Sequence, residues 1–186
     1  MPLPRRSLFA FTFPLAGCLR SNLPDYGTVP PFRLIDQSGQ PFDSGRRLAG
    51  MTWVAAFIFT TCNGPCPRMT AQMRKVQDAT SGMEDVRLVS FSIDPATDTP
   101  ARLAEYAARF KANPSRWSFL TGEESVIRAL GVDTFHLADP HEKLAHSSRF
   151  ALVDRKSRIR GYYYTALAGA VEEVVAGIQT VRREWL

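Results

Sequence analysis

The sequence predicts an α/β domain with a central mixed β-sheet flanked by helices. Nearly continuous apolar runs, typical of strands covered on both faces, alternate with amphipathic segments that have helical spacing. The C-terminal part departs from this alternation, because two strand-like segments follow one another and a helix-like segment ends the chain. Strands that alternate with helices are typical of a sheet with helices on both faces. The 186 residues, of which 45% are hydrophobic, suffice for one domain with a real core.

Each element follows from a local pattern. Apolar and polar residues alternate around Ser38-Gly39, which predicts a hairpin within residues 30–48. Pro100 fits the first position of a helix, with Asp98 or Thr99 as its cap. Apolar runs and helical spacing place the other elements as follows: strands over 51–59, 86–94 and 117–122, helices over 67–80 and 123–130, a hairpin over 147–164, and a terminal helix over 169–185.

The charge pattern argues against a nucleic-acid-binding surface. The formal net charge is +5, and acidic and basic residues are mixed along the chain rather than gathered into a basic run. A nucleic-acid footprint needs clustered Lys and Arg, so we expect no nucleic-acid partner.

The N-terminus has the pattern of an export signal. Two arginines precede a short apolar stretch, and Leu15-Ala16-Gly17-Cys18 closes it. The stretch is too short to span a bilayer, which takes about 20 residues. The four closing residues resemble a bacterial lipobox, which implies that residues 1–17 are removed as a lipoprotein-type signal peptide and that Cys18 is acylated. The alternative is a plain secretory signal followed by an ordinary buried cysteine.

We therefore expect an exported protein that is held on a membrane through a lipid on Cys18. Residues 18–30 would form the lipidated anchor and tether, and residues 31–186 the folded domain. The domain would face the periplasm, or the outer side of the cytoplasmic membrane, of a bacterium.

Cys62 and Cys66 stand where the apolar run 51–59 meets the amphipathic segment 67–80. In an exported protein such a pair can close into a disulfide. A loop this short makes a poor structural staple, because loop-closure stabilisation grows with loop length. The pair is therefore better explained as a redox couple or as metal ligands. Functional groups in such sheets gather at the carboxyl ends of strands, which is where Cys62 falls.

Thiolate chemistry is compatible with reduced copper as the metal. Reduced copper is soft and prefers thiolate sulfur. If both cysteines lay in the first helical turn, positions i and i+4 would put them on one face, and the helix N-terminus would favour the anion. Two thiolates around Cu(I) carry a net negative charge, and an imidazole is a suitable third ligand. The same thiols could instead exchange with the disulfide of a partner.

Three features together resemble the Sco (SenC) family of copper-handling, thioredoxin-like proteins. They are Cys62-x-x-x-Cys66-Pro67 at the first strand–helix junction, Asp94-Pro95 after the next strand, and His146 directly before the following hairpin. The resemblance covers residues 31–186 and implies a thioredoxin-like fold. One departure is Asn63, which stands where many family members carry proline. It bears on the stiffness and reactivity of the thiol loop but not on the ligand set.

The resemblance implies a copper-binding metallochaperone. Cys62, Cys66 and His146 would hold copper and deliver it to the binuclear copper site of a cytochrome c oxidase subunit during assembly. The alternative is a thiol–disulfide oxidoreductase. There Cys62 and Cys66 would be the redox-active, catalytic pair, would keep the acceptor's cysteines reduced, and would themselves be reduced by a thioredoxin-like protein. A redox or copper sensor is a further alternative. No residue separates these functions, so enzymatic activity stays undecided, with the balance toward a chaperone.

Other residues that invite a functional interpretation have simpler explanations. His136 and His141 lie five residues apart, which matches neither a helix face nor a strand face, so we expect them in a solvated loop. Met69 and Met73 continue the cysteine stripe at helical spacing and are expected in the core. Asp94 fits a turn before a proline.

Overall fold

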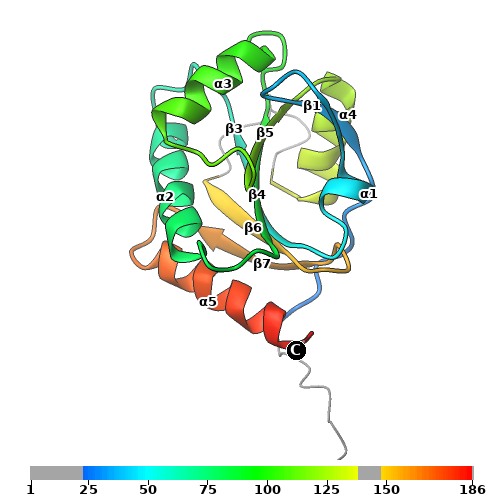
Figure 1. Cartoon of the computed structure of the whole chain (residues 1–186), viewed down its shortest axis with the longest axis vertical. Coiled ribbons are helices and arrows are strands. Elements are labelled where there is room, and N and C mark those ends of the chain that lie inside the picture. The colour runs from blue at the N-terminus through cyan, green and yellow to red at the C-terminus, as the bar shows by residue number, and fades with distance from the viewer. Residues whose placement is uncertain (1–22, 138–147, 186) are drawn as a thin grey trace, which may run out of the picture.

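A seven-stranded sheet runs through the middle of the molecule, in the order β2-β1-β5-β4-β3-β6-β7 (Figure 1). The computed structural model describes residues 23–137 and 148–185, so Cys18, His141 and His146 lie outside the described residues. Strands β3, β4 and β5 pair in parallel, whereas β1, β2, β6 and β7 join the sheet antiparallel. The predicted mixed sheet flanked by helices is confirmed.

The elements keep close to the predicted order. The strands are Arg33–Asp36 (β1), Pro41–Asp43 (β2), Thr52–Ile58 (β3), Val86–Ser92 (β4), Trp117–Thr121 (β5), Arg149–Val153 (β6) and Ile159–Tyr164 (β7). The helices are Ser44–Arg47 (α1), Pro65–Ala79 (α2), Pro100–Arg109 (α3), Glu124–Ala129 (α4) and Ala170–Arg183 (α5). A π-helical turn, Leu130–Thr134, continues α4.

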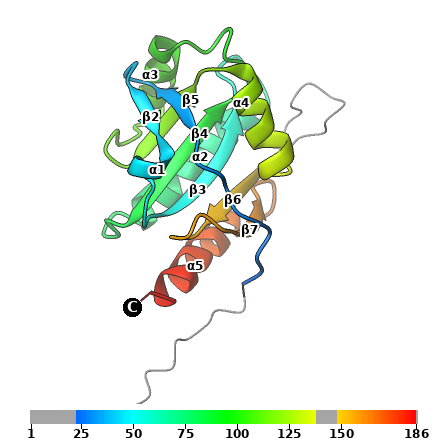
Figure 2. The ribbon, with the colours of Figure 1, turned by 90° about the vertical axis from the view of Figure 1, so that its right-hand side faces the viewer.

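Side-chain alternation along β3 supplies a core on each face of the sheet. Val54 and Ile58 pack into the core beneath α2, α3 and α5. Trp53 and Phe57 point the other way, into a core that also contains Ile127 of α4. Every residue of β3 is buried, as its nearly continuous apolar run predicted. The two helical layers on either side of the sheet are visible in Figures 1 and 2.

The first hairpin and the cap of α3 show how short sequence signals fix local structure. Asp36 accepts hydrogen bonds from the amides of Ser38 and Gln40, and Gly39 takes a φ of 77°, so the predicted turn around Ser38-Gly39 is confirmed. Of the two predicted caps for α3, Thr99 is the one used, because its hydroxyl accepts from the amide of Arg102 at 3.4 Å.

Two details of the helices differ from the sequence expectation. Helix α2 begins at Pro65 rather than at residue 67, since proline is favoured in the first turn, where its missing N–H is not needed. The four-residue helix α1 was not predicted. It is too short to show helical periodicity, and it is placed by tertiary contacts such as the 2.8 Å hydrogen bond from the Phe32 amide to the Ser44 hydroxyl.

Part of the segment that we expected to be a tether packs against the domain instead. We call residues 23–29 the N-terminal strap. The strap runs antiparallel to the start of β7: the Tyr26 amide donates to the Ile159 carbonyl at 2.9 Å, and the Ile159 amide donates to Gly27 at 2.8 Å. Val29 is buried, with 4% of its surface exposed. The strap therefore extends the edge of the sheet, and any free tether must end before residue 23.

One arginine fastens the strap to the rest of the molecule. The buried guanidinium of Arg160 donates to the carbonyls of Leu23 and Pro24 at 3.0 and 2.9 Å. It also pairs with Asp154 at 3.0 Å and with Glu184, after α5, at 2.9 Å. A buried charge is tolerated only when it is paired and hydrogen-bonded, and Arg160 satisfies this with partners from three separate segments.

Candidate metal centre

Cys62 and Cys66 lie where β3 ends and α2 begins. β3 leaves the sheet after Ile58, beside the parallel end of β4 at Ser92. A loop, residues 59–64, then carries Cys62, and Cys66 lies in the first turn of α2. Both side chains are nearly buried, with 6% and 3% of their surfaces exposed, and both are free thiols. The predicted position at the carboxyl end of a central strand is confirmed.

Cys62 does not lie on the helix, which corrects the simplest picture of how the two thiols meet. The residue before α2 is Gly64, with φ −116° and ψ −115°, so helical geometry starts only at Pro65. The i, i+4 relation along a helix face therefore does not apply. A tight turn brings the cysteines together, and within it the Gly64 amide donates to the Cys62 sulfur at 3.4 Å.

The two thiols are electrostatically unequal. Burial raises the pKa of Cys62, but hydrogen bonds to its sulfur from the Cys66 thiol and from the Cys66 and Gly64 amides outweigh this, and the pKa is lowered overall. The pKa of Cys66 is raised to about 12, first by burial and then by the hydrogen bond to Cys62. Cys62 is therefore the thiol that ionises first, while Cys66 keeps its proton and donates it toward the Cys62 sulfur.

A short chain of hydrogen bonds connects Cys66 to α3. The Thr70 hydroxyl donates to the Cys66 carbonyl at 2.8 Å and lies 3.0 Å from the Tyr106 hydroxyl of α3. Burial raises the pKa of Tyr106 to about 12, and the nearby cysteines add to this effect. Met69 and Met73 pack deeper in the same core, with 2% and 0% of their surfaces exposed, as predicted for core methionines.

Asp98 was predicted only as a possible helix cap, but its buried carboxylate holds the thiol loop in place. Asp98 is 0% exposed. It accepts from the amide of Thr60 at 3.1 Å, from the Thr60 hydroxyl, and from the Ser92 hydroxyl at 2.6 Å. Asp98 thus connects the loop before Cys62 to the end of β4. The signal available in the sequence was a second acid close to Asp94, after a strand that ends beside the cysteines.

Asp94 itself forms the predicted turn. Its carbonyl accepts from the amides of Thr97 and Asp98, at 3.1 and 2.8 Å. The backbone of Asp94 therefore shapes the loop that presents Asp98.

Of the three histidines, the structure describes His136, and it lies on the surface as predicted. The Nδ1 atom of His136 is 3.1 Å from the Val132 carbonyl, and its own carbonyl accepts from Arg149 at 3.1 Å. Among residues 23–137 and 148–185, no group of three or more His, Cys, Asp or Glu side chains is arranged to hold a metal ion. Within the described residues, the candidate metal ligands are therefore the thiols of Cys62 and Cys66.

Strand β6 begins at the end of the sheet that holds the cysteines. Ala151 of β6 pairs with Ala55 of β3, and β6 runs antiparallel to β3, so Arg149 enters the sheet toward the carboxyl end of β3. The guanidinium of Arg149 lies over the rings of Tyr162 and Tyr164, at 5.4 and 5.3 Å. We call this end of the molecule the cysteine pole.

The family model described as SCO1/SenC matches residues 21–182. The chain belongs to the SCO1/SenC family. The match starts within the segment that precedes the strap, ahead of the residues over which the motifs predicted the resemblance. It therefore agrees with the observation that the strap is part of the folded domain.

Three solved structures show the same fold. A SCO1/SenC family lipoprotein from Bacillus anthracis is 32% identical, with a TM-score of 0.75 over 83% of this chain and 95% of that one. BsSco, described as a member of the Sco family of cytochrome c oxidase assembly proteins with a disulfide switch, is 30% identical, with a TM-score of 0.75 over 89% and 98%. Bradyrhizobium japonicum ScoI with copper bound, at 23% identity and a TM-score of 0.66 over 83% and 99%, supports the fold alone.

Within residues 23–137 and 148–185, no helix is both long enough and apolar enough to cross a bilayer.

Proposed function

We propose that this Sco protein binds copper through Cys62 and Cys66 and delivers it to the binuclear copper site of cytochrome c oxidase. The observation that carries the proposal is the buried pair of unequal free thiols at the carboxyl end of β3. Thiolates are preferred ligands of Cu(I). The similar chain BsSco is described as belonging to a family of oxidase assembly proteins, which supports the choice of acceptor.

The inequality of the thiols suggests an order of binding. Cys62, with its lowered pKa, offers the first thiolate. Cu(I) then displaces the proton of Cys66, whose pKa is about 12 without metal, and that proton leaves to solvent. The Gly64 amide and the N-terminus of α2 stabilise the net negative charge that two thiolates and one Cu(I) leave behind.

We assign the third ligand position to His146, which lies outside the described residues. The motif resemblance supports this assignment, and so does the entry of β6 at the cysteine pole only a few residues later. Imidazole nitrogen is a suitable donor for both oxidation states of copper. The surface histidine His136 has no such support.

Export and lipid attachment through Cys18 complete the proposal. The related chain from Bacillus anthracis is described as a lipoprotein, and the lipobox-like residues 15–18 precede the strap. If Cys18 carries the lipid, the mature protein will sediment with membranes and Cys18→Ser will release it. Mass spectrometry that finds an unmodified Cys18 in the mature chain would refute this part.

The test of copper binding is the metal content of reduced protein, with Cu(I) affinity measured by chelator competition. We expect one Cu(I) per chain in the parent protein and its loss in Cys62→Ser and Cys66→Ser. Oxidation to the Cys62–Cys66 disulfide should also abolish binding, because a disulfide has no thiolate to offer. Equal Cu(I) affinity before and after oxidation would remove these cysteines from the site.

Thiol–disulfide exchange is a second candidate, and the same asymmetry favours it. The Cys62 thiolate would attack an acceptor disulfide to give a mixed disulfide, and Cys66, after losing its proton, would attack Cys62 and release the acceptor as a dithiol. The Cys62–Cys66 disulfide that results needs a thioredoxin-like reductant to complete the cycle. Reduction of a two-cysteine peptide from the acceptor site, measured with and without Cu(I), separates the two functions.

A further inference from the structure

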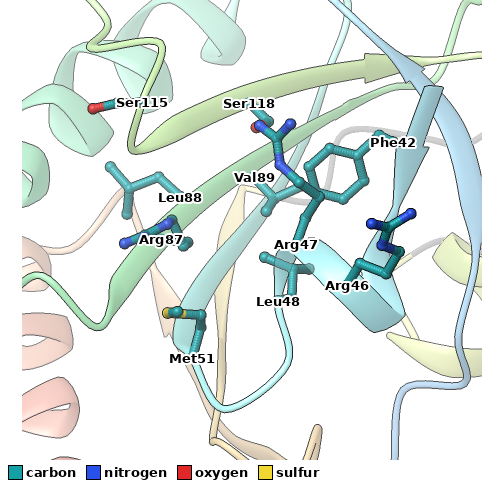
Figure 3. Close-up of a pocket in the computed structure, with 10 residues that line it drawn as sticks. All are labelled: Phe42, Arg46, Arg47, Leu48, Met51, Arg87, Leu88, Val89, Ser115 and Ser118. Carbon is teal, nitrogen blue, oxygen red and sulfur yellow. The ribbon is translucent and has the colours of Figure 1, made fainter. Parts of the chain in front are cut away.

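A cavity of about 350 Å³ opens at the end of the sheet opposite the cysteine pole. It lies between α1, the first residues of β4 and the start of β5, as Figure 3 shows. Its lining includes Arg46 and Arg47 of α1 on one side and Arg87 of β4 on the other, together with Ser115 and Ser118. No carboxylate is among the described residues that line it. The cavity therefore has the donors of an anion site.

The three arginines are not neutralised by the neighbouring acids. Within the described part of the chain, none of them forms an ion pair, whereas the nearby Asp43 pairs with Arg33 and Asp85 pairs with Arg155 and Arg182. Arg47 lies over the Phe42 ring at 5.4 Å, and Arg87 donates to the backbone carbonyls of Glu84 and Val86 at 2.5 and 2.9 Å. Of the remaining acids, Glu84 is the nearest to Arg87 along the sequence, and its side chain is exposed.

A fourth guanidinium shows that positive charge accumulates here. Arg116, next to Ser115, has its pKa lowered by burial and by the charge of Arg87. It donates hydrogen bonds to the backbone carbonyls of Gln77, Thr80 and Met83 and to the Thr80 hydroxyl, and no carboxylate among the described residues is a partner. Guanidinium groups bind phosphate with two parallel hydrogen bonds, which makes a phosphate group the fitting occupant.

The N-terminal strap lies at the same end of the molecule. β3 and β4 start side by side, with Thr52 paired to Val86, and the turn between β6 and β7 lies next to them. The strap is fastened to the first residues of β7 by Arg160. Neighbouring strands are about 4.8 Å apart, so β7 lies roughly 15 Å from β4 across this end. Arg160 also joins the Leu23 carbonyl, at the start of the strap, to Glu184 after α5.

We propose that this end of the molecule rests on an anionic membrane surface, with the phosphate of a lipid headgroup bound in the arginine-lined cavity. A chain tethered just ahead of the strap would bring this end to the bilayer and turn the cysteine pole away from it. Exposed Lys156, on the β6–β7 turn, adds positive charge between the strap and the cavity. The inference rests on the membrane attachment proposed above. Its test compares anionic with neutral vesicles, so a failure of lipid attachment and a failure of the arginine-lined cavity can be told apart.

The experiment is sedimentation of the full chain with vesicles of phosphatidylcholine, with or without phosphatidylglycerol. The ratio of the two partition coefficients cancels any apolar insertion of the N-terminus. Each basic residue near an anionic surface contributes about 1 kcal/mol, so Arg46→Gln/Arg47→Gln should lower that ratio by tenfold or more. Arg47→Gln/Arg87→Gln should do the same. The matched control is Arg68→Gln/Arg102→Gln, which removes two exposed arginines from the cysteine pole and should keep the ratio within about twofold.

The outcomes are distinct. A loss confined to the two cavity variants, with unchanged thermal unfolding, supports the proposal. An equal loss in the control would show that the total charge and not the cavity attracts the vesicles, which overturns it. A parallel titration uses inorganic phosphate alone. If inorganic phosphate binds in the cavity while the vesicle ratio is the same in all variants, the occupant is a free anion and the membrane proposal is wrong.

Discussion

At the scale of single residues, the main feature is that two chemically identical side chains, Cys62 and Cys66, have opposite pKa shifts. Cys62 accepts hydrogen bonds in a turn, whereas Cys66 is buried in the first turn of α2. The lowered pKa of Cys62 gives it more thiolate at neutral pH, and the raised pKa of Cys66 keeps it protonated. The same pair can therefore capture a soft metal or act as attacking and resolving thiols.

We expect iodoacetamide to modify Cys62 before Cys66, with the order read by peptide mass spectrometry. The rate for Cys62 should rise with pH through a midpoint below the ordinary thiol value of 9.0. In Cys66→Ala the midpoint should move upward, because the thiol that donates to the Cys62 sulfur is gone. An unchanged midpoint in Cys66→Ala would show that the two thiols do not interact.

The prediction for His146 concerns the two oxidation states of copper. Two thiolates satisfy Cu(I) in near-linear geometry, whereas Cu(II) prefers more ligands and harder donors. His146→Ala should thus weaken Cu(II) binding by well over tenfold, more than about 1.4 kcal/mol, and leave Cu(I) bound with reduced affinity. Titration followed by the Cu(II)–thiolate absorption band is the measurement. His136→Ala and His141→Ala are the controls, and loss of the band in either one would move the ligand to that residue.

At the scale of elements, the sequence predicted the strand–helix alternation, the first hairpin and the closing hairpin and helix, because periodicity and turn residues are local signals. It also placed the cysteines at the end of β3. It did not predict where Cys62 lies relative to α2, since Gly64 and Pro65 decide this through backbone angles that apolar spacing does not record. The strap was missed because its hydrogen bonds join residues 23–29 to β7, which is far away in the sequence.

Asp98 illustrates a site residue that only the folded chain identifies, and it gives a prediction for the loop between β3 and α2. Asp98→Ala leaves the Thr60 amide and the Thr60 and Ser92 hydroxyls without their acceptor. Unsatisfied buried donors cost about 1–3 kcal/mol each, partly relieved by water, so we expect a loss of about 2–4 kcal/mol in urea unfolding. The looser loop should also speed alkylation of Cys62.

Asp94→Ala is the matched control for Asp98, because Asp94 lies on the same loop and contributes its backbone carbonyl to the turn. Its effect on unfolding should stay within about 0.5 kcal/mol. If both substitutions had the same small effect, Asp98 would not be what holds the thiol loop.

At the scale of the whole molecule, the two ends of the sheet differ in the side chains that they gather. The cysteine pole holds the two buried free thiols. The opposite end gathers ion pairs that join segments far apart in the sequence. Asp85, before β4, pairs with Arg155 of the β6–β7 turn at 2.6 Å and with Arg182 of α5 at 2.8 Å. These ion pairs therefore lie at the end of the sheet away from the thiols.

The ion pairs of Asp85 predict how stability depends on pH. Burial opposes ionisation of Asp85, but the hydrogen bonds from Arg182 and Arg155 prevail and lower its pKa from 3.8 to about 2. A lowered pKa in the folded state means that the stabilisation is present in full above pH 3.8 and is lost as the pH falls through about 2. At 1.36 kcal/mol per pKa unit, the contribution is about 2 kcal/mol.

Asp85→Asn should therefore lower the free energy of unfolding by about that amount near neutral pH. The difference from the parent protein should shrink below pH 3.8 and disappear near pH 2. Urea unfolding across this range is the measurement, with Asp78→Asn as control. Asp78 is more than half exposed and pairs with Arg74 along one helix, so its removal should cost less than about 0.5 kcal/mol at any pH. A difference for Asp85→Asn that stays constant from neutral pH to pH 2 would show that packing, and not charge, is what Asp85 contributes.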